Sequence, residues 1–292
     1  MYIVKFKKKV FKLFFIFIKM KKIVVLGSSG MLGVYVSSLL KTHSKNVYDI
    51  DRTKFSITSL NLNFDLTTLF VNLKLNKNDI VINCIGSIPQ KNPSKKDLYL
   101  INTIFPIILS NICELFECRL IHITTDCVFD GTIGNYSEDD TSTSIDDYGL
   151  SKSLCESHIK GSIIRCSIIG HEIDVQKYGL LDVILSNNNG QMKGYKNHLW
   201  NGVTCLELAY IINYMIDVQF FFEGVRHIHS IKVISKCDLI KLVNNIYDLN
   251  IDITEVNHEQ SINRSLRSNY KQFYEIKSLE EQIKELQKFF LR

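Results

Sequence analysis

Residues 21–33 have the sequence KKIVVLGSSGMLG, in which a short β-branched run ends at a glycine and two further glycines follow. The run predicts a buried parallel strand, and the apolar spacing of VYVSSLLKTH directly after it predicts a helix. Gly27, Gly30 and Gly33 thus have the spacing GxxGxxG between a strand and a helix. Such glycines allow a tight turn, a close approach of backbone to a pyrophosphate, and close packing of helix on strand. The stretch predicts a dinucleotide-binding unit with phosphates at the helix N-terminus; a glycine-rich turn without a ligand is the alternative.

The same alternation of strand and helix continues along the chain. It predicts strands at 46–51, 78–86, 118–126 and 161–170, and helices at 98–116 and 148–160. Strands and helices at this spacing favour an α/β fold with an open parallel sheet and helices on both faces. From about residue 171 the pattern loosens, and it ends in the amphipathic stretch LEEQIKELQKFF. We expect an extension at 1–19, a nucleotide-binding domain at 20–170 and a smaller substrate-binding lobe at 171–292 that can interleave with it.

Composition narrows the classes of partner and compartment. The net charge of the 292 residues is only +5, and no basic stripe is interleaved with aromatics, so we expect no nucleic-acid partner. The eight cysteines form no CxxC and lie mostly in apolar runs. This pattern favours buried thiols in a reducing cytosol over a disulfide framework or a zinc site. We therefore expect a cytoplasmic protein without a metal.

The first twenty residues are basic and apolar. Their apolar part, VFKLFFIFI, is too short to span a bilayer and is interrupted by Lys12. We expect a dispensable extension or a mis-assigned start before Met20, and no membrane partner. A signal segment or membrane anchor is the alternative.

Acidic and basic side chains follow the second predicted strand, about twenty residues beyond the glycines. Asp51 can accept hydrogen bonds from an adenosine ribose, which favours NAD, as can the neighbouring Asp49. Arg52 can instead pair with a 2′-phosphate, which favours NADP. With both present, the preference stays open. We expect Asp65, in NFDL, to end a further strand and to contact the adenine.

The glycine spacing together with a downstream YxxxK, formed by Tyr148 and Lys152, resembles the short-chain dehydrogenase/reductase superfamily in its extended, sugar-nucleotide branch. VINCIG, INTIFP, ITTDCVFDG and RCSIIG fit that resemblance in the same order, and INRSL near the C-terminus resembles a segment of the dTDP-4-dehydrorhamnose reductase group. The resemblance covers most of residues 21–292. It implies a Rossmann-like doubly wound sheet, NADP or NAD as cofactor, and a homodimer.

The resemblance also implies a set of site residues. The catalytic group is Thr125, Tyr148 and Lys152. Cofactor contacts are expected from Gly27, Ser29, Gly30, Met31, Leu32, Gly33, Asp51, Arg52, Asp65, Leu66, Cys84, Ile85, Gly86, Asn102, Tyr148, Lys152 and Ile168. Substrate contacts are expected from Ser87, Thr125, Asp126, Cys127, Lys193, Tyr195, Trp200 and Arg264.

The chemistry of ketone reduction explains why these residue types are needed. A proton must reach the oxygen while a hydride reaches the carbon. Tyr148 and Lys152 are four residues apart and so share one face of a helix. An ammonium beside the phenol should lower the pKa of Tyr148 toward the operating pH. Thr125 donates a hydrogen bond that polarises the carbonyl.

The substrate implied by the resemblance is a nucleotide-linked 4-keto-6-deoxy sugar carried by UDP or dTDP, on a route to a rhamnose-like or acetamido sugar. Cys127 stands where the dTDP-4-dehydrorhamnose reductase group usually has tyrosine, and Ile168 where that group often has tryptophan. Both differences leave the nucleotide and the sugar open. In KGYKNHLWNG an aromatic, Tyr195 or Trp200, can stack on the base or sugar, and Lys193 and Arg264 can meet the diphosphate. Trp200 as a core residue is the alternative.

Parts of the sequence also fit activities other than ketone reduction. GDP-fucose synthase has a cysteine two residues after its catalytic serine, as Cys127 follows Thr125 here, and a histidine after the sixth strand, as His171 follows IIG. This resemblance implies a 3,5-epimerase with a cysteine base and a histidine acid, or else a substitute residue and an ordinary loop histidine. A non-catalytic NADP-binding regulatory subunit, resembling the partner of methionine adenosyltransferase, is the rival class. A dehydratase is disfavoured because Asp126 is followed by Cys127 and not by glutamate.

Overall fold

The computed structural model describes residues 21–57, 61–173 and 177–290, so the N-terminal extension expected at 1–19 lies outside the described residues. Its centre is a six-stranded sheet in the order β10-β5-β4-β3-β1-β2, and every neighbouring pair in it is parallel. The strands are β1 (Lys22–Leu26), β2 (Asn46–Ile50), β3 (Ile80–Asn83), β4 (Arg119–Thr125), β5 (Ser162–Cys166) and β10 (Gly224–His227). The α/β fold with a parallel sheet is confirmed.

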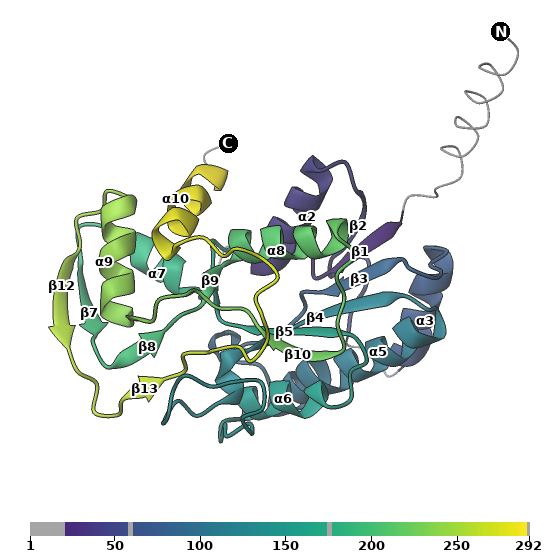
Figure 1. Ribbon diagram of the computed structural model, residues 1–292, viewed down its shortest axis with the longest axis horizontal. Coiled ribbons are helices and arrows are strands. Elements are labelled where there is room, and N and C mark those ends of the chain that lie inside the picture. The colour runs from purple at the N-terminus through teal and green to yellow at the C-terminus, as the bar shows by residue number, and fades with distance from the viewer. Residues whose placement is uncertain (1–20, 58–60, 174–176, 291–292) are drawn as a thin grey trace, which may run out of the picture.

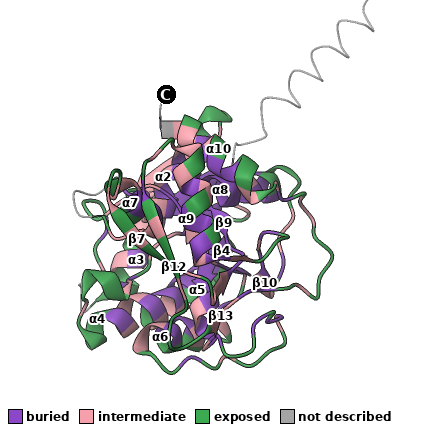
Figure 2. Ribbon diagram, turned by 90° about the vertical axis from the view of Figure 1, so that its left-hand side faces the viewer, coloured by how far each residue is buried: buried purple, intermediate pink, exposed green. Residues whose placement is uncertain are grey.

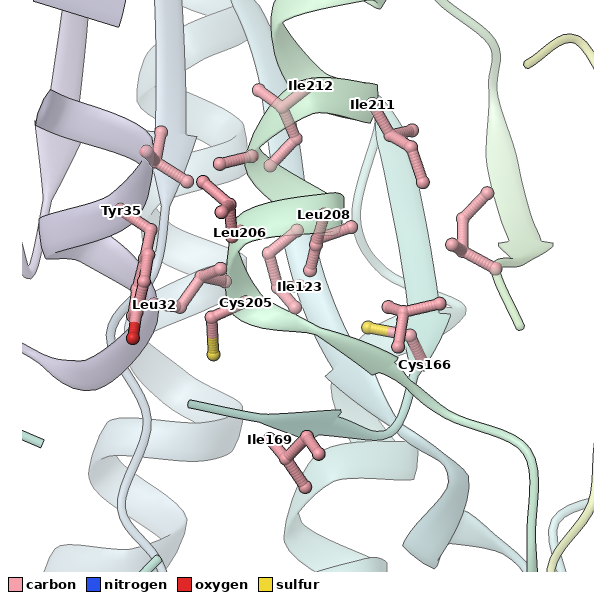
Figure 3. Packing of buried hydrophobic residues seen from close by; sticks show 14 of the residues in the cluster. Leu32, Tyr35, Ile123, Cys166, Ile169, Cys205, Leu206, Leu208, Ile211 and Ile212 are labelled. Carbon is pink, nitrogen blue, oxygen red and sulfur yellow. The ribbon is translucent and has the colours of Figure 1, made fainter. Parts of the chain in front are cut away.

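Helices cover both faces of the sheet (Figure 1). Alternate residues of each strand point to opposite faces, so Val25 and Ile82 join one core cluster while Val24 and Val81 join the other. The first face is covered by α2 (Met31–Thr42) and α8 (Cys205–Asp217), and the second by α3 (Leu62–Asn72), α5 (Phe105–Leu115) and α6 (Asp147–Glu156). Figure 3 shows side chains of α2 and α8 meeting over the first face. Two buried faces explain why the central strands β1 (KIVVL) and β3 (IVIN) are mostly apolar and fully buried.

The order of the strands reverses at β1, which lies between β2 and β3. In open parallel sheets, ligands bind outside the carboxyl ends of the strands at such a switch point. The glycine turn follows β1 and VINCIG ends β3, so the sheet brings these two motifs together.

One sequence expectation about this region is wrong. Asp65 and Leu66 do not end a strand but lie on α3, where Leu62, Leu66 and Phe70 are buried at helical spacing. Leu66 is fully buried in the core and has no exposed surface for a cofactor. The period of the apolar residues, and not the short NFDL string, decides the structure here.

The long helix predicted at 98–116 spans Lys95–Leu115, as α4 (Lys95–Tyr99), a π-helical segment η2 (Leu100–Ile104) and α5. The π-helical turn accommodates Pro106, which has no N–H to donate within the helix. By length and composition alone this helix could cross a membrane. It packs instead against the sheet, where Phe105 and Leu109 are fully buried.

The remaining elements form a smaller lobe beside the carboxyl ends of the strands (Figure 1). It contains the strand pairs β7 (Gln191–Tyr195) with β12 (Asp252–Val256) and β6 (Ile168–Ile169) with β9 (Val203–Thr204), and a sheet of β11 (Ile234–Ser235), β8 (His198–Trp200) and β13 (Ile262–Asn263). Its helices are α7 (Leu180–Ser186), α9 (Lys236–Ile246) and α10 (Leu279–Phe290). Between them the chain returns to the main sheet, because α8 packs on α2 and β10 pairs with β5. In Figure 2 buried residues line α8, whereas α4 exposes most of its surface.

A buried polar network joins the two regions. Arg165 on β5 forms a salt bridge with Glu156 at the end of α6 (2.5 Å), and both side chains are less than a tenth exposed. Arg165 also donates to Nε2 of His227 (2.9 Å), whose Nδ1 donates to the carbonyl of Arg267 (2.8 Å). Burial and the neighbouring guanidinium lower the pKa of His227 to about 4. The imidazole is therefore neutral at physiological pH and connects the main sheet to the C-terminal segment.

The glycine turn generates a first prediction. A Cβ at Gly33 would overlap the carbonyl oxygen of Gly27, whereas a Cβ at Gly30 would lie 3.3 Å from that oxygen. Gly33→Ala should therefore push α2 from β1 and lower the free energy of unfolding by about 2 kcal/mol or more. Denaturant unfolding would measure the loss, with Gly30→Ala as the milder control. Equal stability of the two variants would contradict this packing.

The neutral His227 generates a second prediction. Its folded pKa lies below the ordinary 6.5, so its contribution to stability is complete above pH 6.5 and is lost as the pH falls toward 4. The loss from this residue is at most about 3 kcal/mol. Denaturant unfolding at a series of pH values should show a shallower acid slope in His227→Gln, whose amide keeps both hydrogen bonds. An unchanged slope would show that His227 does not titrate this way.

Candidate active site

The turn after β1 is built to receive an anion. Gly27 has φ +77°, a conformation that favours glycine, and its N–H donates to the carbonyl of Ile50 at the end of β2 (2.8 Å). Gly30 is the N-cap of α2, so no side chain caps this helix, and its first turn holds no acidic residue. The N–H groups of that turn are available to a phosphate. Ser29 and Met31 lie at this rim, whereas the Leu32 side chain is in the core.

The end of β2 borders this turn. Asp51 follows β2, and its carboxylate accepts hydrogen bonds from the N–H (3.0 Å) and hydroxyl (2.6 Å) of Thr53, which lower its pKa. Arg52 beside it is exposed. Asp49 faces α2 instead, where it pairs with Ser37 and Lys41. Asp51 and Arg52 thus have the positions expected of ribose-recognising residues, and Asp49 does not.

The loop after β3 is fixed by a buried asparagine. Asn102, in the π-helical segment, accepts a hydrogen bond from the N–H of Ser87 (2.9 Å) and donates to its carbonyl (2.9 Å) and to the hydroxyl of Ser151 on α6 (3.1 Å). This clamp holds the loop against the helix that carries Tyr148 and Lys152. A Cβ on Gly86 would lie 3.0 Å from Nζ of Lys152, so the ammonium sits directly over this loop. Cys84, Ile85 and Gly86 follow β3, beside the glycine turn.

Thr125 ends β4 and is buried. Its hydroxyl accepts a hydrogen bond from the N–H of Cys127 (3.1 Å) and donates to the carboxylate of Asp126 (3.2 Å). Asp126 and Cys127 form a short 3₁₀ turn, η3 (Asp126–Val128). Burial raises the pKa of Cys127 to about 12, with a further contribution from the Asp126 charge, so the side chain is a thiol at neutral pH.

Helix α6 brings Tyr148 and Lys152 to this turn. Its N-cap Asp146 accepts a hydrogen bond from the N–H of Gly149 (2.8 Å), and a Cβ at Gly149 would overlap the carbonyl of Cys127. Only a glycine therefore lets the start of α6 lie this close to the threonine turn, and sequence reasoning missed this residue. The Tyr148 hydroxyl is close enough to Thr125 for that side chain to lower the pKa of Tyr148. The predicted catalytic side chains are brought together.

The protonation of Tyr148 differs from the sequence expectation. Burial and the neighbouring Cys127 raise the pKa of Tyr148 far above its ordinary value, and among the main causes only the nearby Thr125 side chain lowers it. Burial also lowers the pKa of Lys152. The lowering of the Tyr148 pKa that was expected from Lys152 is outweighed because the phenol is held among apolar and weakly acidic groups. Tyr148 is accordingly a protonated hydrogen-bond donor.

The substrate lobe contributes two cations. Arg264, which was expected to meet the diphosphate, donates through Nε to the carbonyl of Phe129 (2.8 Å) and through Nη1 to Sγ of Cys127 (3.8 Å), so it lies beside the threonine turn. Lys236 was not predicted. Its Nζ lies 4.9 Å from the centroid of the Trp200 ring and within electrostatic range of Asp126 and Arg264. No motif marks it, since it simply begins α9 after β11.

The aromatic residues of the lobe divide into core and rim. Trp200 is only 3% exposed and belongs to the core, so the expected stacking of this ring on a base is not supported. Tyr195 instead packs against His198 (ring centroids 4.9 Å apart) and His258 (5.3 Å), with all three rings at least partly exposed. Lys193 is exposed on β7, two residues from Tyr195 and therefore on the same side of the strand.

His171 has a different environment from the one proposed for an epimerase acid. Its Nε2 is 2.9 Å from the Tyr247 hydroxyl and its Nδ1 is 3.5 Å from Asp182. Burial lowers its pKa. Ile168, by contrast, lies on β6 directly after the end of β5.

The described residues contain no disulfide and no cluster of metal-ligating side chains. All eight cysteines are free and lie within the described ranges. Residues 21–57, 61–173 and 177–290 contain no group of three or more His, Cys, Asp or Glu side chains that could hold a metal ion.

Comparison with known proteins adds to this geometry. A model of the family described as the RmlD substrate binding domain matches residues 20–171. The dTDP-4-dehydrorhamnose reductase of Mycobacterium tuberculosis is 24% identical over 116 residues, which are 39% of this chain and 36% of that protein. The match thus spans about a third of the length of this curated relative.

Solved structures share the fold over nearly the whole chain. A dTDP-4-dehydrorhamnose reductase of Clostridium acetobutylicum has a TM-score of 0.77 and 19% identity, covering 93% of this chain and 100% of that one. A dTDP-4-dehydrorhamnose reductase of Bacillus anthracis, crystallised in complex with NADP, also has a TM-score of 0.77, with 18% identity and coverage of 93% and 99%.

Proposed function

Because the chain belongs to the RmlD substrate binding domain family, we propose that it is an NAD(P)H-dependent oxidoreductase that reduces the ketone of a nucleotide-linked 4-keto-6-deoxy sugar. The observation that carries this proposal is the convergence of Thr125, Tyr148 and Lys152 at the carboxyl end of β4, beside the loop that Asn102 clamps. These are the groups that ketone reduction requires, and they come from two segments of the chain, the end of β4 and helix α6.

The residues present fit a dinucleotide. The uncapped N-terminus of α2 and the Gly27 turn suit a pyrophosphate, Asp51 and Arg52 suit an adenosine ribose, and Lys152 over Gly86 suits a second ribose. A bound NADPH or NADH would supply the hydride. The related reductase of Bacillus anthracis was crystallised with NADP, and we propose NADP or NAD here without a preference, because Asp51 and Arg52 favour opposite choices.

The chain's own residues handle the proton. A raised pKa keeps Tyr148 protonated, which is the form needed to donate a proton to a carbonyl oxygen as it gains negative charge. Thr125 donates a second hydrogen bond to the same oxygen and stabilises the developing alkoxide. The Lys152 ammonium, one helical turn from Tyr148, stabilises the phenolate that remains after transfer. Tyr148 therefore already holds the proton that reduction of the ketone requires.

The sugar and its partners are further proposals. A UDP- or dTDP-linked substrate, a route to a rhamnose-like or acetamido deoxysugar, a homodimer and a cytoplasmic location are all supported by the resemblance. The rival class, a non-catalytic NADP-binding regulatory subunit, would not need the intact catalytic group. The presence of Thr125, Tyr148 and Lys152 together, with Tyr148 close to Thr125, favours the enzyme.

Tyr148→Phe tests the reductase. Oxidation of NADPH and NADH, followed by absorbance with UDP-, dTDP- and GDP-linked 4-keto-6-deoxy sugars, should show turnover of at least one substrate. Removal of the proton donor should lower kcat by about 10²–10⁴-fold with cofactor affinity unchanged. Tyr214→Phe makes the same change at a more exposed tyrosine on α8 and should retain full activity. Cofactor binding without turnover of any sugar would favour the regulatory subunit.

Epimerisation is a finer question that the resemblance to GDP-fucose synthase raises. It would need a thiolate at Cys127 and an imidazolium at His171, whereas burial raises the pKa of the first to about 12 and lowers the pKa of the second. We therefore propose reduction without epimerisation.

Turnover in deuterated water tests this. NMR of the product should show no deuterium at C3 or C5, and Cys127→Ser should reduce the substrate at a similar rate. Deuterium that enters at either carbon and is lost in Cys127→Ser would instead establish the epimerase.

A further inference from the structure

Lys236 is a cation without an ionic partner. It is the first residue of α9, and its side chain is partly buried with Nζ 4.9 Å from the centroid of the Trp200 ring. No carboxylate of the described residues lies within salt-bridge distance of this ammonium. The Trp200 indole N–H, in a side chain that is 3% exposed, likewise has no hydrogen-bond partner in the described structure.

The position of Lys236 is electrostatically unfavourable for a lysine. A cation at the N-terminus of a helix opposes the helix dipole. Arg264 is close enough to lower the pKa of Lys236, as burial also does, and only Asp126 and Cys127 act in the opposite direction. A buried charge without a partner is costly unless a ligand supplies the counter-charge. The arrangement therefore points to an anion.

Arg264 and Lys236 both lie near the turn that carries the catalytic threonine. Its Nη1 contacts Sγ of Cys127 (3.8 Å), and the N–H of Cys127 donates to the Thr125 hydroxyl (3.1 Å). The segment that carries Arg264 is fixed by Asn201, which accepts a hydrogen bond from the N–H of Leu266 (2.9 Å) and donates to its carbonyl (2.7 Å). Arg264 is thus held in contact with Cys127, in the turn that follows Thr125.

Aromatic rings lie beyond the two cations. Lys236 and Arg264 are both close enough to His198 to lower its pKa, and His198 belongs to the ring cluster with Tyr195 and His258. Lys236 is therefore within electrostatic range of both the threonine turn, through Asp126 and Cys127, and the partly exposed rings, through His198. A ketosugar joined through a diphosphate to a base presents a negative group between a ketone and an aromatic ring.

We propose that Lys236 is a substrate-binding residue that, together with Arg264, binds the diphosphate of the nucleotide sugar. This assignment rests on the proposed function for the identity of the sugar, but the binding of a diphosphate is separable from turnover. A lysine ammonium binds phosphate as a point charge, whereas an arginine guanidinium binds it through two parallel N–H groups. The two side chains can therefore bind one diphosphate together. The Trp200 ring holds the lysine stem and keeps the ammonium in place.

The chain contains a single tryptophan, Trp200, so its fluorescence reports directly on this position. Inorganic pyrophosphate, UDP, dTDP and GDP would each be titrated into the full chain while Trp200 emission is recorded. Pyrophosphate and at least one nucleoside diphosphate should change the emission saturably. Lys236→Met keeps the apolar stem, and we expect it to raise Kd by about tenfold or more, the value of one charged contact. Lys236→Arg should stay within about threefold of the wild type, because it keeps the charge.

Three controls separate binding from structure. Lys241→Met makes the same change at an exposed lysine of α9 that pairs with Glu255, and it should leave Kd unchanged. The affinity for NADPH, followed by the fluorescence of the reduced nicotinamide, should be equal in all variants if the fold is intact. Thymidine, which has no phosphate, should bind wild type and Lys236→Met equally.

The outcomes are distinguishable from those of the reductase assay. The proposal is overturned if wild type binds neither pyrophosphate nor a nucleoside diphosphate, or if Lys236→Met binds them as wild type does. It is also overturned if thymidine affinity falls in parallel, because Lys236 would then act only through the packing of Trp200. Diphosphate binding that depends on Lys236, in a protein that reduces no sugar, would support this subsite while the proposed function fails.

Discussion

The cofactor site depends on the close contact of α2 with the turn after β1. Gly33 lies against the carbonyl of Gly27, and no side chain fits between them. This contact aims the N-terminus of α2 at the carboxyl ends of β1 and β3. The loop after β3, the Asn102 clamp and the Lys152 ammonium are all arranged around that point. A change in the angle of α2 would therefore alter the cofactor site before it altered the sheet.

A second close approach sets the chemistry. Gly149 allows α6 to touch the backbone at Cys127, and this brings the phenol of Tyr148 to the hydroxyl of Thr125. The same closeness leaves both Tyr148 and Cys127 only partly exposed, and burial is the largest cause of their raised pKa values. Tyr148 remains a phenol and Cys127 a thiol, so the site combines three cations, Lys152, Arg264 and Lys236, with the carboxyl group of Asp126. Such a site favours substrates that bring negative charge and reactions that consume a proton.

The cofactor half of this arrangement was predictable from the sequence because its signals are local. A β-branched run followed by Gly27 predicts strand and turn, and Tyr148 and Lys152 share a helical face whatever surrounds them. Expectations that depended on tertiary packing were less successful. Asp65 was placed on a strand because a four-residue string was given more weight than the helical period of Leu62, Leu66 and Phe70. The environment of Tyr148 could not be inferred from spacing, since burial outweighs a charge one turn away.

The substrate lobe was predicted less well for the same reason. Trp200 occurs in a loop-like string but is buried, because β8 pairs with β11 and β13 on either side of it. Lys236 is separated from it by 36 positions in the sequence and carries no motif. Only the antiparallel register of Trp200 with Ile234 brings the start of α9 beneath the ring.

The return of the chain to the main sheet has a consequence for how the molecule is made. Strand β10 covers the edge of β5, yet it is synthesised about sixty residues later, and α8 is likewise needed to close one face over α2. A nascent chain that has reached only the end of β5 carries an open strand edge and an uncovered apolar face. Such surfaces favour aggregation and recruit chaperones. Residues 20–171, which match the family model, therefore leave this strand edge and this apolar face uncovered until α8 and β10 have been made.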